Sequence, residues 1–363
     1  MQYQHSIIIA VITGLLAGCG GGGGTSSTLS PFLRSSVPYH TPTRVGTFQP
    51  HNISGTAAAV TDIFVKDLNN DNVEEVVIGG RMTAQNNVAN HSTSNIQIYG
   101  WNTGSFRSET SRWFSGTDNA IIGTEPSIKF GDFNGDGKPD MFVAPSTDMT
   151  IYGPGVVFLN NGNSFNRVNL NLGNAWSHDS AVTDLNGDGY ADIIVTDYNQ
   201  RPSIAFGSAA GTFNIVTAST TQPGGSGISV ADYLGNGSKT VIMTDSGQTG
   251  RSDTHLYSWN TSSGSLVLTQ ISALPESRFY LSKWDSVRAV NPGLAPHDIR
   301  NISMDFNRDG RPDVIVFSTM PKGTNAHGYS EVQFLRNDGS GTFTDVTDSV
   351  LRNYNTNKTT SYQ

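Results

Sequence analysis

Short apolar segments with alternating polar positions run through most of the chain, and clusters of Gly, Asn, Ser and Asp separate them. The segments are rich in β-branched and aromatic residues, and a period of two in such residues is typical of half-buried β-strands. The intervening clusters favour tight turns, because Gly and Asn tolerate the backbone conformations that turns require. The pattern therefore predicts an all-β fold built from hairpins.

One acidic nonapeptide recurs along the chain at the spacing of structural repeats. Copies begin at Asp67, Asp132, Asp184 and Asp305, and a degenerate copy begins at Asp232. Successive copies begin 65, 52, 48 and 73 residues apart. Each copy lies between a short strand-like segment and a strongly β-forming one, so we expect it to form the loop of a β-hairpin. Spacings of this size suit the blades of a β-propeller.

A second hairpin is predicted after each acidic loop. An alternating segment is followed by an Asn- or Gly-rich turn, an aromatic residue or Leu, and further strand, as in residues 157–165. Two hairpins in each repeat give four strands, the composition of a propeller blade. Residues 44–48 resemble the end of such a second hairpin. We therefore predict an all-β propeller of four-stranded blades, with five repeats visible and five to seven blades in the ring.

The acidic loops carry oxygen-bearing side chains at positions 1, 3, 5 and 9. Position 6 needs a residue that tolerates a left-handed backbone, and position 7 offers its backbone carbonyl. Hard oxygen ligands in this number suit Ca²⁺, whereas Zn²⁺ would favour His or Cys. The sequence therefore predicts three to four bound Ca²⁺ ions as the cofactor. The predicted metal ligands are Asp67, Asn69, Asp71, Val73, Glu75, Asp132, Asn134, Asp136, Lys138, Asp140, Asp184, Asn186, Asp188, Tyr190, Asp192, Asp305, Asn307, Asp309, Arg311 and Asp313.

Other roles for the acidic loops fit the sequence less well. An EF-hand needs a bidentate Glu at position 12, where these loops carry an apolar residue inside a predicted strand, and it is rejected. Asp-Gly and Asn-Gly pairs could serve only as hairpin turns, but a bare turn has no use for the ninth-position carboxylate. This turn-only interpretation stays open as the weaker alternative. In the degenerate loop, positions 3 and 9 are Leu234 and Thr240, so no metal is expected there.

The N-terminal segment predicts export and lipid attachment. Residues 7–18 form an apolar run that is too short to span a bilayer but is typical of a signal peptide. It ends in Leu-Ala-Gly-Cys, residues 16–19, which resembles the lipobox of bacterial lipoproteins. We predict a signal peptide over residues 1–18, a lipidated Cys19 with a Gly/Ser/Thr-rich tether over 19–40, and the propeller over 41–363. Because Cys19 is the only cysteine, no disulfide is expected.

Composition and charge limit the partners. The formal net charge is −8, with 22 Lys and Arg against 30 Asp and Glu, which argues against nucleic acid. Four bound Ca²⁺ ions would bring the formal charge to zero. The predicted location is the bacterial cell envelope, with the lipid anchor as the only membrane contact, at the outer membrane and facing the periplasm or the exterior.

The acidic loops, the apolar strands after them and the Asn/Gly/Phe hairpins together resemble the FG-GAP/VCBS repeat family over about residues 55–348. This resemblance implies a calcium-binding β-propeller similar to that of integrin α subunits. The family includes adhesion domains, carbohydrate binders, scaffold modules and some polysaccharide lyases. We therefore predict a membrane-anchored binding or adhesion module for glycan or protein ligands. A polysaccharide lyase-like or other glycan-active enzyme is the alternative, and a structural envelope scaffold is the third possibility.

No nucleophile, metalloprotease or phosphate-binding motif is found in the sequence, and no catalytic residue is predicted. If the protein is an enzyme, His178 and His297 are the candidate acids or bases, because each precedes an Asp just upstream of an acidic-loop strand. Trp101 and Trp259 recur at equivalent places, and packing between blades is favoured over sugar stacking. Residues 274–290 could form a short helix or a lid over one face.

Overall fold

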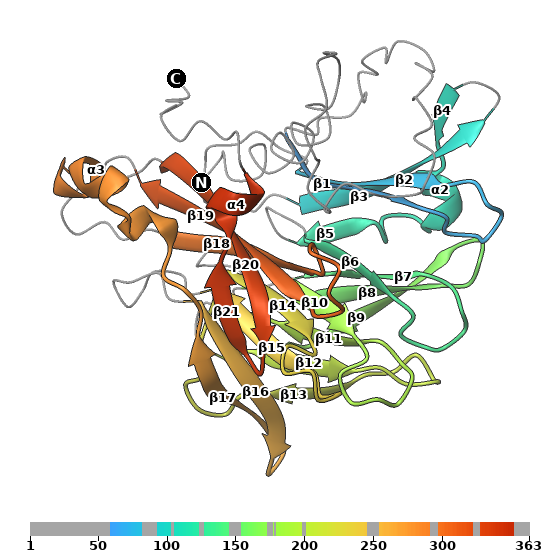
Figure 1. Cartoon of the computed structure of the whole chain (residues 1–363). Helices are drawn as coiled ribbons and strands as arrows, with labels where there is room; N and C mark the ends of the chain where they lie inside the picture. The colour runs from blue at the N-terminus through green and yellow to red at the C-terminus, as the bar shows by residue number, and fades with distance from the viewer. Residues whose placement is uncertain are drawn as a thin grey trace.

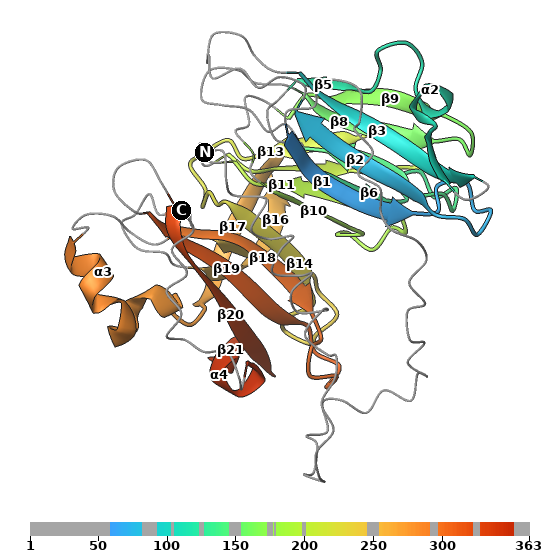
Figure 2. The same cartoon turned by 90° about the horizontal axis from the view of Figure 1, so that it is seen from above.

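Five antiparallel sheets stand side by side in chain order in the computed structural model of the protein (Figure 1, Figure 2). Within each sheet the strands follow one another in sequence order, so every blade is a simple meander. The structure describes residues 59–81, 93–102, 105–122, 127–144, 154–172, 177, 179–197, 201–244, 254–290, 297–321 and 327–351.

Each blade is built from two successive hairpins, as the sequence predicts. Blade 1 contains β1 (Ala59–Lys66), β2 (Glu75–Arg81), β3 (Thr93–Asn102), β4 (Ser105–Ser108) and an added strand, β5 (Ala120–Ile122), that pairs with β3. Blade 2 contains β6 (Ile128–Gly131), β7 (Asp140–Val143), β8 (Gly155–Asn160) and β9 (Phe165–Leu170). Blade 3 contains β10 (Ser180–Thr183), β11 (Asp192–Val195), β12 (Ser203–Phe206) and β13 (Asn214–Thr217).

The last two blades follow the same plan, and several of their strands are longer than those of blades 2 and 3. Blade 4 contains β14 (Gly227–Ala231), β15 (Thr240–Thr244), β16 (His255–Ser262) and β17 (Ser265–Ala273). Blade 5 contains β18 (His297–Met304), β19 (Asp313–Pro321), β20 (His327–Gly339) and β21 (Thr342–Asp345). Five four-stranded blades in a row confirm the predicted all-β propeller.

The hydrophobic core lies between blades. Between blades 3 and 4, for example, Ile194 and Ile204 pack in one cluster with Val241 and Leu268. Three further clusters join blades 1 and 2, blades 2 and 3, and blades 4 and 5. Because both faces of an internal blade are covered in this way, its short strands are almost entirely apolar, as in the fully buried β11.

Short helices lie at the edges of the blades. Residues 274–290 contain η2 (Arg278–Tyr280), η3 (Ser282–Trp284) and α3 (Asp285–Val290), in agreement with the predicted short helix. The Arg278 side chain is only 6% exposed and pairs with Asp345 at the end of β21 and with Asp348 in α4 (Thr347–Val350), which fastens this segment to blade 5. A further short helix, α2 (Thr110–Trp113), packs its Trp113 into the core of blades 1 and 2. No helix within the described ranges is long and apolar enough to cross a membrane.

Candidate functional site

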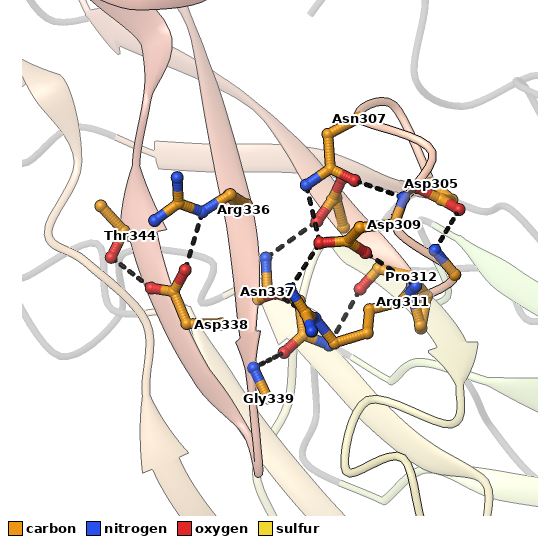
Figure 3. A network of polar contacts seen from close by, with 12 residues as sticks. Asp305, Asn307, Asp309, Arg311, Pro312, Arg336, Asn337, Asp338, Gly339 and Thr344 are labelled. Carbon is orange, nitrogen blue, oxygen red and sulfur yellow. Dashed lines mark hydrogen bonds and ion pairs between the residues drawn. The ribbon is translucent and has the colours of Figure 1, made fainter.

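The five acidic nonapeptides form the loops between the first two strands of the five blades, as predicted. The first-position carboxylate closes each loop by accepting backbone N–H groups from positions 5 and 6. In blade 5, Asp305 Oδ1 and Oδ2 accept from Asp309 N at 3.0 Å and Gly310 N at 2.9 Å (Figure 3). The degenerate loop closes in the same way, because Asp232 accepts from Asn236 N and Gly237 N. Loop closure therefore needs only the first-position Asp.

Position 5 extends this network in all five loops, including Asn236 with Ser238 N in blade 4, and position 3 extends it in the four other loops. In blade 3, Asn186 Oδ1 accepts Asp188 N at 2.9 Å, and Asp188 Oδ1 accepts Tyr190 N at 3.0 Å. The equivalent bonds recur in blades 1, 2 and 5. Each carboxylate and amide oxygen has two lone pairs, so these side chains keep acceptor capacity beyond the loop bonds. They lie at the surface, partly or fully exposed.

Two residues of every loop adopt a left-handed backbone. Position 6 does so as predicted, and position 4 does so as well, which the sequence analysis missed. Four of the position-4 residues are Asn70, Gly135, Gly187 and Gly235, and this recurrence of Asn and Gly was an available signal. In blade 5 the residue is Arg308, at φ 60°, where a side chain with a Cβ atom costs about 1–2 kcal/mol.

The ninth-position carboxylate points into the protein and clamps the loop to the rest of its blade. Asp140 is fully buried, and its Oδ2 accepts Phe133 N at 2.9 Å while its Oδ1 accepts Asn160 N at 2.7 Å. Asp192 accepts Leu185 N and Gly207 N in the same way, and Asp313 accepts Phe306 N and Asn337 N. In blade 1, Glu75 accepts Leu68 N. In blades 2, 3 and 5 this carboxylate therefore ties the start of the loop to the turn of the second hairpin.

Two asparagines carry the clamp on to the neighbouring blade, and the sequence analysis did not identify them. Asn337 Nδ2 in blade 5 donates to the backbone carbonyl of Tyr233 in blade 4 at 3.0 Å. It also donates to Pro312 O in its own loop (Figure 3). Asn160 in blade 2 repeats this arrangement with Leu68 O in blade 1 at 2.6 Å. The only sequence signal was the Asn that opens each of these second-hairpin turns. The acidic loops are thus coupled to the junctions between blades.

Burial dominates the electrostatics of the clamp. It raises the pKa of Asp140 and of Asp192 to about 6, because loss of water penalises the charged form more than the amide hydrogen bonds favour it. Repulsion from Asp136 and Asp132 raises the pKa of Asp140 further. The pKa values of Glu75 and Asp313 are also raised by burial. The carboxylates of one loop are therefore close enough to repel one another.

Two loops carry a cation of their own at position 7. Lys138 Nζ lies 2.8 Å from Asp136 Oδ2, and Arg311 Nη2 lies 2.5 Å from Asp309 Oδ2. These contacts help to hold the pKa of each fifth-position carboxylate below its usual value, against desolvation, which acts in the opposite direction. The other loops have the uncharged Val73 and Tyr190 at this position. A metal ion would compete with the internal cation in blades 2 and 5 only.

The structure brings the predicted ligands of each loop into one turn but gives them two different roles. Side chains at positions 1, 3 and 5 surround the exposed loop, and the ninth-position side chain faces inward. In the described part of the chain, no three His, Cys, Asp or Glu side chains are grouped closely enough to hold a metal ion. The hard-oxygen donor set and the mutual repulsion of the carboxylates fit Ca²⁺. The calcium assignment therefore stays a prediction.

The aspartates of the two His-Asp pairs lie at the starts of inner strands, Asp179 just before β10 and Asp298 within β18, and they join blades. Asp179 Oδ2 accepts Ile228 N of blade 4 at 3.3 Å, and its Oδ1 lies 3.1 Å from Lys129 Nζ of blade 2. Asp298 accepts from Thr254 of blade 4 at 2.7 Å and from Ser318 at 2.6 Å. His178 and the side chain of His297 lie outside what the structure describes.

The two recurrent tryptophans differ. Trp259 donates its indole N–H to Lys239 O of its own blade. Its ring centroid lies 6.1 Å from that of Phe206 in blade 3, which confirms packing between blades. Trp101 is 47% exposed and contacts Phe106 of its own hairpin, and none of the described blades packs against it, so packing between blades stays a prediction for this residue. No described blade precedes blade 1, which explains the difference. Cys19, the signal peptide and the tether lie outside the described residues.

These features define a β-propeller whose blades carry Asp-rich hairpin loops. The profile of the FG-GAP-like repeat matches three overlapping stretches, residues 87–143, 132–195 and 184–243. The chain therefore carries FG-GAP-like repeats over residues 87–243, and its fold is a β-propeller. Among curated proteins, no sequence matches this chain.

Several solved structures resemble the chain in fold. The Dos1 propeller is 13% identical, with a TM-score of 0.45 over 80% of this chain and 61% of its own. A candidate exo-β-1,3-galactanase from Bifidobacterium bifidum is 14% identical, with a TM-score of 0.37 over 78% and 90%. A GH43 β-1,3-galactosidase is 11% identical, with a TM-score of 0.39 over 78% and 92%. At these values the similarities carry no argument about activity.

The clamp can be separated from the exposed loop by two isosteric substitutions in blade 3. Asp192→Asn replaces an acceptor oxygen with an amide that faces a buried N–H donor, so we expect a loss of about 1–3 kcal/mol of unfolding free energy. Asp188→Asn keeps an acceptor for Tyr190 N at an exposed position, so the loss should stay within about 0.5 kcal/mol. Urea denaturation in the presence of a chelator measures both. Equal losses would refute the separate roles.

Proposed function

We propose that this protein is a calcium-stabilised binding propeller held at the bacterial cell envelope by a lipidated Cys19. The observation that carries the proposal is the recurrence of one donor set in four of five loops. The loop of blade 4 lacks both the third-position amide and the ninth-position carboxylate, yet it closes with the same hydrogen bonds. Closure alone therefore does not account for the acidic side chains that the four other loops retain.

Ca²⁺ would be held by the side chains at positions 1, 3 and 5 and by the carbonyl at position 7. The ninth-position carboxylate would contribute through the lone pairs that its two amide bonds leave free. The ion would supply the positive charge that offsets repulsion between the loop carboxylates, and its binding energy would add to folding energy. Since the clamp couples loop and blade junction, calcium would stabilise the contact between blades as well as the hairpin.

Calcium titration of variant pairs tests the metal sites. Sites of extracellular type bind at about 0.1–1 mM, so 10 mM Ca²⁺ should add about 1–3 kcal/mol per site to the free energy of unfolding. Asp188→Asn in blade 3 should remove one site and its share of the stabilisation. Asp232→Asn in the degenerate loop is the matched control and should leave the stoichiometry unchanged. Calorimetry and thermal unfolding, with Mg²⁺ for comparison, give the two readouts.

The outcome that contradicts the metal sites is equally definite. If parent protein and Asp188→Asn show the same heat of binding and the same melting temperature with and without calcium, the acidic side chains serve only the turn network. The turn-only interpretation would then replace the calcium assignment in every loop.

Binding is favoured over catalysis by the contacts of Asp179 and Asp298, the aspartates that follow His178 and His297 in the sequence. Asp179 and Asp298 are buried, and all four carboxylate oxygens have partners. Those of Asp179 contact blades 4 and 2, and those of Asp298 contact Thr254 of blade 4 and Ser318 of its own blade. Neither is therefore free to orient a neighbouring His or to act on a substrate. A binding module presents its ligand contacts on loops at the surface of a rigid scaffold, and glycans or proteins are the ligand classes proposed here. A lyase-like enzyme that uses His178 or His297 is the second candidate.

Glycan arrays and lyase assays on the intact protein distinguish these candidates. A binding module should leave a bound glycan or protein ligand chemically intact. The His297→Ala variant should then bind the same ligand and also leave it intact. An unsaturated product that appears with the parent protein and disappears in His178→Ala or His297→Ala would establish the enzyme instead. The glycan-array and lyase assays need calcium present throughout, so that unfolding of the protein is not mistaken for loss of activity.

The lipid anchor has its own test. Cys19→Ser should abolish incorporation of labelled fatty acid and move the protein from the membrane fraction to the soluble fraction, because acyl chains supply the only proposed membrane contact. A serine variant that still pellets with membranes would contradict anchoring through Cys19.

A further inference from the structure

One face of blade 1 is apolar, and no described blade covers it. Ile63 is 48% exposed, Val65 is 56% exposed and Trp101 is 47% exposed. Pairing in the sheet places Val65 opposite Val76, and Val76 opposite Tyr99, two residues before Trp101. These side chains therefore form one stripe across the sheet, on the face opposite to the one that packs against blade 2.

Blade 4 carries the same stripe at equivalent positions, and there it is covered by blade 3. Ile63 and Val65 correspond to Ile228 and Val230, counted from Asp67 and Asp232. Ile228 is 3% exposed, against 48% for its counterpart in blade 1. Trp101 corresponds to Trp259, which packs against Phe206 of blade 3. The exposed face of blade 1 thus has the composition of a surface that packs against a preceding blade.

The outer part of this face in blade 4 is covered by the outermost strand of blade 3 and the segment after it. Val216 and Ala218 pack in the core between the two blades, and Ala218 is 2% exposed. Ser219 N donates to Ser265 Oγ of β17 at 2.8 Å, and Leu268 N donates to Gln222 Oε1 at 2.9 Å. A strand that ends just before a blade therefore covers the second hairpin of that blade.

The segment before blade 1 repeats the turn that precedes such a strand and residues that follow it, with Pro50 and His51 in the places of Ile215 and Val216. Phe48 stands 19 residues before Asp67, as Phe213 stands 19 residues before Asp232. Without a gap, residues 46–48 repeat the Gly-Thr-Phe of residues 211–213, and Ser54 and Thr56 repeat Ser219 and Thr221. In this register Ile53 takes the place of the buried Ala218, and Gln49 takes the place of the exposed Asn214.

We infer that residues 46–56 dock on the second hairpin of blade 1 and cover Trp101, as the end of blade 3 covers Trp259. The occupant is thus a segment of the same chain, which lies outside the described residues. Its apolar anchor is Ile53, whose side chain is larger than that of its counterpart Ala218. Docking removes the exposed indole of Trp101 from water, which the hydrophobic effect favours. The inference does not depend on calcium or on the proposed ligands.

Quenching of Trp101 and hydrogen exchange in the full chain test this docking. Acrylamide quenching is measured on the parent, and the fluorescence of the Trp101→Phe variant is subtracted; the difference should show a shielded indole. In the parent, the amides of residues 51–56 should be protected from hydrogen exchange at least about tenfold. Ile53→Asp should expose Trp101 and abolish that protection. Gln49→Asp adds the same charge at the position of an exposed counterpart and should change neither readout.

Three results would overturn the inference. The first is a fully quenched Trp101 in the parent together with unprotected residues 51–56. The second is shielding that survives Ile53→Asp unchanged. The third is shielding that disappears on dilution, which would assign the face to a second copy of the chain instead. Blade stability, followed by urea unfolding of each variant, separates undocking from global unfolding.

Discussion

The buried carboxylate at the ninth position of four acidic loops is the interaction on which the rest of the blade depends. In Asp140, Asp192 and Asp313 it accepts one N–H from the start of its loop and one from the turn of the second hairpin. A charged group at this depth is stable only with such partners. Each of these three clamps thereby fixes the spacing of the two hairpins, and in blades 2 and 5 the clamp reaches the preceding blade through Asn160 and Asn337.

Junctions between blades combine this polar clamp with an apolar core. The clusters between sheets supply most of the buried surface, and the carboxylates at the starts of inner strands add directional bonds, as Asp62 does with Ile128 N. Because the two kinds of contact meet at every junction, a repeat cannot bury its faces without its neighbours. Blade 1 shows the consequence, since its outward face exposes Ile63, Val65 and Trp101.

The loops serve two purposes with one set of residues. The first-position Asp organises the turn, and the acidic side chains at positions 5 and 9 crowd negative charge that an ion of opposite charge would offset. Blades 2 and 5 already offset part of it with Lys138 and Arg311, whereas blades 1 and 3 have no cation at the equivalent position. The loops are therefore equivalent in backbone conformation but unequal in electrostatics.

The sequence by itself determined the strands, the hairpins, the blade count among the visible repeats and the repeat family, because these follow from local alternation and from spacing along the chain. It also located every acidic loop and the left-handed position 6. Tertiary structure alone decided that Asp140 and its equivalents face inward, that Asn160 and Asn337 bridge blades, and that Trp259 is covered while Trp101 is exposed. These outcomes depend on which sheet lies beside which, and residues with the same local pattern meet different neighbours.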